Sequence, residues 1–91
     1  MMTTDKDEKI ILYPCKFPLK AVGHNEEGFF ETVVDLVSRH IPDLEEHHFS
    51  SRLSSGDKYM SVSVTFTAES REQVDRLYVE MSENKKILMI L

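Results

Sequence analysis

The chain has 91 residues, 41% of them hydrophobic and 30% charged, a composition typical of one folded domain around a single core. Sixteen acidic residues against eleven basic ones give a net charge of −5, which disfavours nucleic acid and anionic membranes as partners. A single cysteine excludes an internal disulfide, and the longest apolar run, Ile87 to Leu91, falls far short of the ~20 residues that cross a bilayer. We therefore expect a cytoplasmic protein without membrane contact.

The N-terminal residues 1–9 are polar and charged and are expected to form a mobile tail before a single domain of residues 10–91. The apolar segment Ile10-Ile11-Leu12-Tyr13 is expected to pack against the side of that domain. From Cys15 to Val22, apolar and polar residues alternate, which predicts a first strand. Pro18, which has no amide donor, is the one residue that argues against it.

A turn at Gly23-His24-Asn25 precedes the first predicted helix, from Glu26 to Ile41, with Asn25 as its N-cap. Acidic residues in the first turn suit the positive end of the helix dipole, and Pro42 stops the helix. Apolar residues recur at spacings of three and four along it, at Phe30, Val33, Val34, Val37 and Ile41.

Two strands joined by a turn are predicted next, from about Glu45 to Ser54 and from about Lys58 to Ala68, with the turn at Ser55-Gly56-Asp57. The second of these strands alternates strictly, so one of its faces should be buried and the other wet. The apolar face carries Met60, Val62, Val64, Phe66 and Ala68.

Ser70 with Gln73 three residues later forms a capping-box pattern, which predicts a second helix that ends between Ser82 and Asn84. The chain closes with the apolar run from Ile87 to Leu91, the last predicted strand.

The predicted order is therefore β-α-β-β-α-β. This order predicts an α+β, ferredoxin-like βαββαβ sandwich, in which two helices cover one face of a four-stranded antiparallel sheet. Right-handed crossovers place the first and third strands in the centre.

The runs from Tyr13 to Gly23, from Gly56 to Val64 and from Glu69 to Val74, together with Leu77-Tyr78, resemble the YbeD-like family of small bacterial proteins of unknown function. The likeness covers most of residues 13–91. It implies a ferredoxin-like fold related to ACT-type regulatory domains, with no established activity.

A looser similarity to ACT domains lies at Asn25-Glu26-Glu27-Gly28. Those domains tend to open the first helix with an acidic residue and a glycine that shape an amino-acid site, and Asn25 departs from the acidic preference. The resemblance implies a candidate ligand-binding loop formed by Gly23, His24, Asn25 and Gly28.

Nothing in the sequence converges into a catalytic or metal site. Of the four histidines, His47 and His48 are adjacent, and adjacent residues on a regular strand point to opposite faces, so both cannot grip one ion. Cys15 lacks a recognised redox or protease motif. We expect no catalytic residue, no metal and no cofactor, and hence no enzyme.

RNA-recognition domains share this strand order, so the wet sheet face needs a separate test. The inner strands lack the paired aromatic residues on which bases stack, and the chain is acidic, so RNA is disfavoured. The residues predicted on this face are Lys16, Lys20, His48, Arg52, Ser61, Ser63, Thr65 and Thr67.

The last strand is apolar on both faces and lies at a sheet edge, so Leu88, Met89 and Ile90 are candidate partner contacts. A homodimer would cover them, and so would the Ile10-Ile11-Leu12 segment folding back. Two functions remain open: a non-enzymatic, ACT-like binding or regulatory module for an unknown small molecule or protein, or a protein-interaction adaptor that acts through the edge strand without a small ligand.

Overall fold

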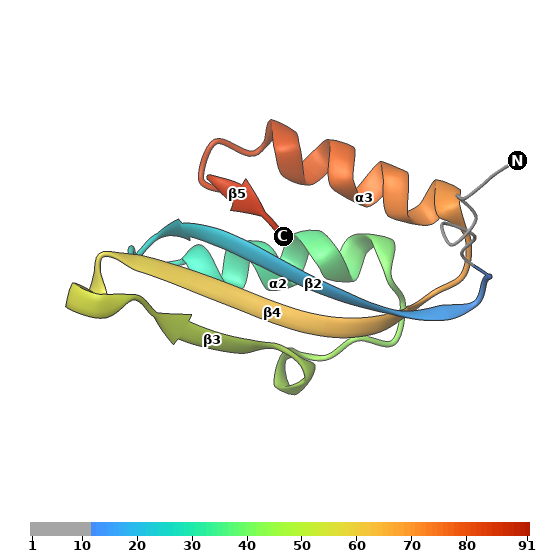
Figure 1. Ribbon diagram of the computed structural model, residues 1–91, viewed down its shortest axis with the longest axis horizontal. Coiled ribbons are helices and arrows are strands. Elements are labelled where there is room, and N and C mark those ends of the chain that lie inside the picture. Colours follow the sequence, from blue (N-terminus) through green and yellow to red (C-terminus); the bar gives the residue numbers. More distant parts are fainter. Residues whose placement is uncertain (1–11) are drawn as a thin grey trace, which may run out of the picture.

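The computed structural model describes residues 12–91 (Figure 1). The predicted tail, and Ile10 and Ile11 of the apolar segment, lie outside the described residues. The elements in chain order are β2 (Cys15–His24), α2 (Phe29–His40), a 3₁₀ turn η1 (Glu46–His48), β3 (Ser50–Leu53), a 3₁₀ turn η2 (Ser55–Asp57), β4 (Tyr59–Ala68), α3 (Arg71–Glu83) and β5 (Met89–Ile90).

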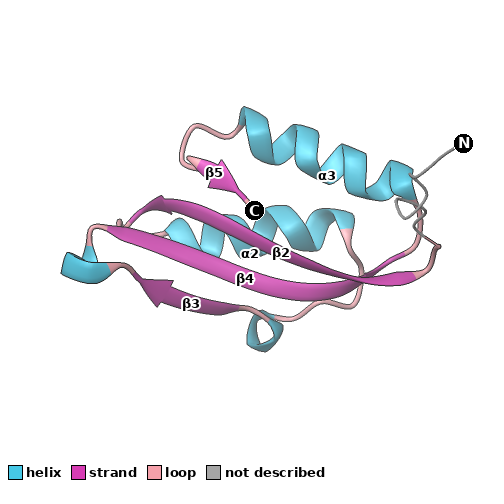
Figure 2. Cartoon of the chain, in the orientation of Figure 1, coloured by secondary structure: helices cyan, strands magenta, loops and turns pink. Residues whose placement is uncertain are grey.

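The four strands form one antiparallel sheet in the order β3-β4-β2-β5 (Figure 2). The first and third strands of the predicted order, β2 and β4, are the central pair, as expected. With two helices against this sheet, the fold is the predicted ferredoxin-like α+β sandwich.

The central pair sets the register of the whole sheet. β2 and β4 pair along their full length, with Leu19 opposite Val64 and Lys20 opposite Ser63. Burial alternates along both strands, so the predicted faces of β4 are confirmed. We call the face that turns away from the helices the open face.

Pro18 fits within β2 because of where its backbone points. Lys20 exchanges two backbone hydrogen bonds with Leu91 next to β5, at 3.2 and 2.8 Å. Residues two apart on a strand direct their backbone groups to the same side, so the nitrogen of Pro18 faces the same sheet edge, beyond the end of β5. No strand among residues 12–91 pairs there, and the missing amide donor costs no ladder bond.

The first helix begins later than predicted, at Phe29, and Asn25 is not its N-cap. Gly28 occupies the cap position with φ of 89°, a left-handed conformation that favours glycine and that ends the turn before the helix. The end of the helix at His40, before Pro42, is close to the prediction.

The strand predicted from Glu45 is wrong in its first half. Residues Glu46–His48 form a 3₁₀ turn, in which the Glu45 amide donates to His48 Nδ1 at 2.9 Å and the Glu45 side chain accepts from the His48 amide. This reciprocal cap competes with strand pairing, so β3 starts only at Ser50 and His48 is not part of the open face.

The second helix begins as predicted. The Ser70 hydroxyl accepts from the Gln73 amide at 3.2 Å, and the Gln73 side chain accepts from the amide of Glu69, one residue before the cap, at 2.8 Å. The Gln73 side chain also donates to the carbonyl of His40 at 3.2 Å, which ties the start of α3 to the end of α2.

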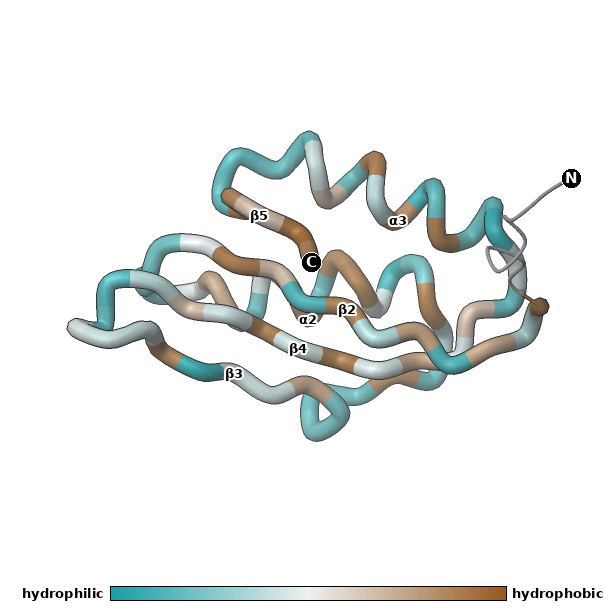
Figure 3. The backbone as a smooth tube through the Cα atoms, in the orientation of Figure 1, coloured by the Kyte–Doolittle hydropathy of each residue, from teal (hydrophilic) through white to brown (hydrophobic). Residues whose placement is uncertain are grey.

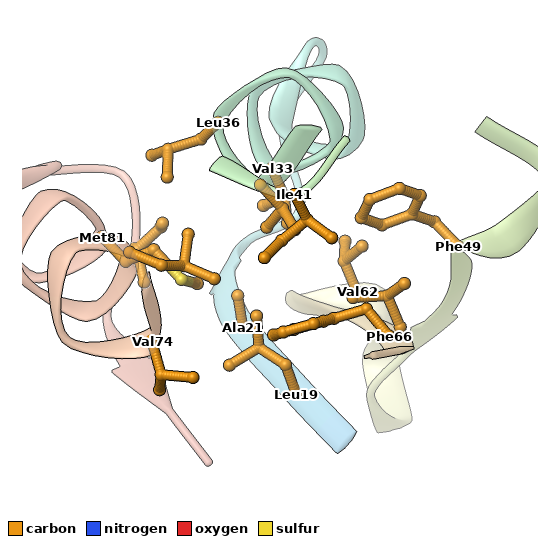
Figure 4. Packing of buried hydrophobic residues seen from close by; sticks show 14 of the residues in the cluster. Leu19, Ala21, Val33, Leu36, Ile41, Phe49, Val62, Phe66, Val74 and Met81 are labelled. Atoms are coloured by element: carbon orange, nitrogen blue, oxygen red, sulfur yellow. The ribbon is translucent and has the colours of Figure 1, made fainter. Parts of the chain in front are cut away.

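The core lies between the helices and the inner face of the sheet. In Figure 4, side chains of α2, such as Val33, and of α3, such as Met81, converge on Ala21 of β2 and Phe66 of β4. No polar or charged residue among those described is buried. The sheet thus has one covered face and one open face.

Candidate functional site

Contacts within the chain occupy part of the predicted ligand loop between β2 and α2, whereas Gly28 has open space at its Cβ position. Gly23 lies in β2, where a side chain would meet the Lys86 carbonyl and the Phe29 ring, each 2.4 Å from the position of a Cβ atom. The side-chain amide of Asn25 donates to the backbone carbonyl of Asp57 at 2.9 Å. The backbone amide of Asn25 donates to the backbone carbonyl of Lys58 at 3.0 Å. The loop is therefore attached to the β3–β4 turn.

A second attachment joins this loop to the segment before β5. Lys86 Nζ lies 2.8 Å from Glu26 Oε1, and this hydrogen bond and the lysine charge lower the pKa of Glu26 below its ordinary value. None of the hollows described below is lined by Gly23, His24, Asn25 or Gly28. Ligand binding at these residues stays a prediction.

The edge strand β5 belongs to a hydrophobic segment of the chain (Figure 3), and several of the apolar side chains there are exposed. Leu88 is 52% exposed, Met89 53% and Leu91 63%. β5 itself is shorter than predicted, but the backbone bonds of Leu88 to Val22 and of Leu91 to Lys20 extend its pairing. We call Leu88, Met89 and Leu91, with the outer backbone edge of β5, the β5 edge.

The register separates the three predicted contact residues. Ile90 pairs with Ala21 and is half-buried on the helix side, whereas Met89 pairs with Val22 and turns to the open face. Leu12, from the segment proposed as a cover, is 77% exposed. Among residues 12–91, nothing covers Met89 or Leu91.

The open face runs without interruption from β3 to the β5 edge. Directly opposed residues share a face, so Arg52, Ser61, Val22 and Met89 form one row across all four strands. The next row joins Ser50, Ser63, Lys20 and Leu91 through the same pairings and the Lys20–Leu91 hydrogen bonds. These rows could not be predicted from the sequence, because they depend on the register between the strands.

One aromatic pair does form on the central strands, which corrects the sequence-based expectation. His24 of β2 and Tyr59 of β4 stack at the hairpin end of the open face, with ring centroids 5.3 Å apart and planes at 25°. Lys58 Nζ lies 5.8 Å from the Tyr59 ring centre.

Two hollows mark the ends of the open face. One of about 110 Å³, near the aromatic pair, is lined by residues that include Val22, Arg52 and Tyr59. The other, of about 350 Å³, lies where the α2–β3 connection meets β2 and β4, and its lining includes Lys16, His48 and Thr67. Residue spacing alone did not indicate either hollow.

The helix side carries a different set of interactions. Glu80 of α3 accepts hydrogen bonds from His40, and from Arg39 at 2.8 Å, both in α2. The hydrogen bond with His40 and the charge of Arg39 lower the pKa of Glu80. Two shallow hollows lie away from the sheet's open face, one along α3 beside Val79 and Glu80 and one between Phe30 and Phe49.

Among the described residues, the histidines and Cys15 do not gather into one site. His47 and His48 occupy a 3₁₀ turn and not a strand, with ring centres 4.2 Å apart, so the geometric argument from a strand does not apply to them. Within the described part of the chain, no three His, Cys, Asp or Glu side chains gather as a metal site would require. Cys15 is half-buried at the margin of the core.

The lengths of the two helices determine whether either could cross a membrane. Among residues 12–91, neither helix is long and apolar enough to span a bilayer.

The fold and this surface define a class: a small ferredoxin-like sandwich with a covered sheet face, an open face and an exposed apolar edge. Residues 8–91 match the family model described as "Protein of unknown function (DUF493)". The chain belongs to this family, which confirms the resemblance to the YbeD-like proteins.

Relatives cover nearly the whole chain. A "UPF0250 protein" from Janthinobacterium is 37% identical over 91 residues and covers all of both chains. Another from Chromobacterium violaceum is 35% identical over 88 residues, 97% of this chain and 99% of that one. The solution structure of HP0495 from H. pylori superposes with a TM-score of 0.67 at 17% identity, over 96% of this chain and 93% of that chain, and supports the fold. These names and descriptions carry no enzymatic activity.

Proposed function

We propose that this protein is a non-enzymatic, cytoplasmic interaction module that binds a protein partner along the β5 edge. The observation that carries the proposal is the exposure of Leu88, Met89 and Leu91 on an edge strand. Exposed apolar side chains beside unpaired backbone groups are the combination that pairs with another chain.

The chemistry of the site supports a binding function over catalysis. A catalytic site would need a nucleophile, a base and a stabilising group within reach of one another. The polar side chains on the open face are lysines, an arginine, hydroxyls and, at one end, His24, which stacks on Tyr59. The four described strands contain no Asp or Glu that could act as an acid or base beside them.

The internal contacts of the β2–α2 loop favour a protein partner over a small ligand. Gly23 has no free space at its Cβ position, and Asn25 and Glu26 already hold partners within the chain. A thermal-shift screen with amino acids and other metabolites tests the small-ligand alternative, because a ligand that binds the folded state raises the unfolding temperature saturably.

Capture from the host extract tests the proposal, with Met89→Lys as the variant and Val79→Lys as the matched control. Val79 is 56% exposed on α3, so the control changes an equally accessible apolar residue away from the sheet edge. We expect the parent protein and Val79→Lys to retain one partner protein in stoichiometric amount, and Met89→Lys to lose it. Identical captured proteins for all three forms would contradict the proposal.

A further inference from the structure

The open face differs in charge from the rest of the molecule. Three charged residues lie on the four described strands, and all are basic: Lys16 and Lys20 on β2 and Arg52 on β3. All three are exposed, and register and alternation direct them away from the helices. A chain of net charge −5 thus keeps one face free of carboxylates on its strands.

These three charges are not used within the described structure. No ion pair joins Lys16, Lys20 or Arg52 to an acidic residue of 12–91, whereas three of the six basic residues off the strands, Arg39, Arg71 and Lys86, have such partners. Exposed charges without a partner leave a positive potential over the surface that carries them.

The spacing of the charges follows β4. Arg52 lies opposite Ser61, Lys20 opposite Ser63 and Lys16 opposite Thr67. At about 3.3 Å per residue, these positions are separated by about 7 Å and then about 13 Å along the strand. Between the basic side chains, β4 presents the hydroxyls of Ser61, Ser63, Thr65 and Thr67.

We infer that the open face binds an acidic segment of the partner protein, laid along β4 so that its carboxylates meet Arg52, Lys20 and Lys16. The inference rests on the proposed function, because the partner that contacts the β5 edge is the chain that presents this segment. The two surfaces are continuous, since Met89 and Leu91 lie in the same rows as Arg52 and Lys20.

An acidic protein segment fits this face better than single-stranded nucleic acid does. The aromatic residues of the face are confined to one end, where His24 and Tyr59 stack on each other and not in the separated positions that hold successive bases. The carboxylates around the helices also oppose a long polyanion more than a short segment.

Fluorescence anisotropy with a labelled glutamate-rich peptide tests the inference, with a single-stranded oligoribonucleotide of equal charge as the second probe. The variant is Lys16→Glu/Lys20→Glu/Arg52→Glu, and the matched control is Arg71→Glu/Arg76→Glu/Lys85→Glu, which makes the same change in net charge among exposed residues off the sheet. Circular dichroism checks that both variants fold. If the sheet variant does not fold, Lys16→Gln/Lys20→Gln replaces it, with Arg71→Gln/Arg76→Gln as its control.

We expect the sheet variant to lose at least about tenfold in affinity for the peptide and the control to stay within about twofold, since oppositely charged contacts act at short range. Equal losses of peptide affinity in both variants would show that binding depends only on the net charge of the protein, which overturns the inference. The inference is also overturned if the parent protein does not bind the peptide. The inference is also overturned if the oligoribonucleotide binds more tightly than the peptide and loses affinity with the sheet variant, because the ligand of the open face would then be nucleic acid. Met89→Lys leaves these three charges in place, so the capture experiment tests the β5 edge and the peptide experiment tests the open face. Either experiment can fail while the other succeeds.

Discussion

At the scale of single residues, the buried face of β4 is the part of the structure that a point substitution tests most sharply. Val64 is 5% exposed and lies opposite Leu19 in the centre of the sheet. Val64→Asp places a carboxylate without a partner in the core, which costs several kcal/mol of the about 5–15 kcal/mol that holds a domain folded. Urea denaturation should find the variant largely unfolded.

Thr65→Lys is the matched control, because Thr65 is the next residue on the same strand and is exposed on the open face. Its unfolding midpoint should stay close to that of the parent. If Val64→Asp were as stable as Thr65→Lys, the assignment of the two faces of β4 would be wrong.

Gly23 is the second residue with a specific requirement. Gly23→Ala would push a methyl group against the Lys86 carbonyl and the Phe29 ring, and overpacking of this kind costs about 1–3 kcal/mol. Lys20→Ala, at an exposed position of the same strand, should change the free energy of unfolding by less than about 0.5 kcal/mol. Equal stability of the two variants would show that the structure around Gly23 accommodates a methyl group without strain.

At the scale of elements, the contact between α2 and α3 depends on the ionisation of Glu80. Its pKa lies below the ordinary value of 4.5 because His40 and Arg39 favour the carboxylate. The stabilisation is therefore complete at pH above the pKa that Glu80 has in the unfolded chain, and it is lost as the pH falls through the lower pKa of the folded chain.

Chemical denaturation between neutral pH and pH 3 measures this contribution. We expect Glu80→Gln to be less stable than the parent near neutral pH, with the difference shrinking in acid. Glu83→Gln, at an exposed position at the other end of the same helix, is the control. A difference between Glu80→Gln and the parent that is constant with pH would exclude this ionic contact.

Long patterned elements were predictable from the sequence, and short ones were not. The strict alternation of β4 and the Ser70 cap of α3 each rest on several consistent residues, and both predictions hold. The late start of α2 follows from the positive φ of Gly28, and the 3₁₀ turn at Glu46–His48 from a local side-chain cap. Neither leaves a periodic signal.

The candidate surface was predictable in part for the same reason. The apolar run at the end of the chain indicated an exposed edge, and Leu88 and Met89 are exposed. The row that joins Arg52 to Met89 depends on three strand registers, and the sequence contains no measure of them. The separation of Ile90 from Met89 depends on the same pairing.

At the scale of the whole molecule, one partner that could cover the β5 edge is a second copy of the chain. Two copies that pair β5 to β5 about a two-fold axis would shield Met89 and Leu91 and continue the sheet. Sedimentation velocity at several concentrations measures this. A concentration-dependent dimer that Met89→Lys abolishes without unfolding would identify the partner as this chain. A monomer throughout would exclude a second copy and leave a different protein or the Ile10-Ile11-Leu12 segment to cover the edge.

Photo-crosslinking in the cell shows whether the β5 edge contacts protein. A photoreactive amino acid at position 89 should form a crosslink to one protein, either this chain or another, because Met89 lies on the exposed edge. The same amino acid at position 79 on α3, equally exposed, should form none with that protein. Absence of a crosslink from position 89, or the same products from both positions, would show that the β5 edge is not a protein contact.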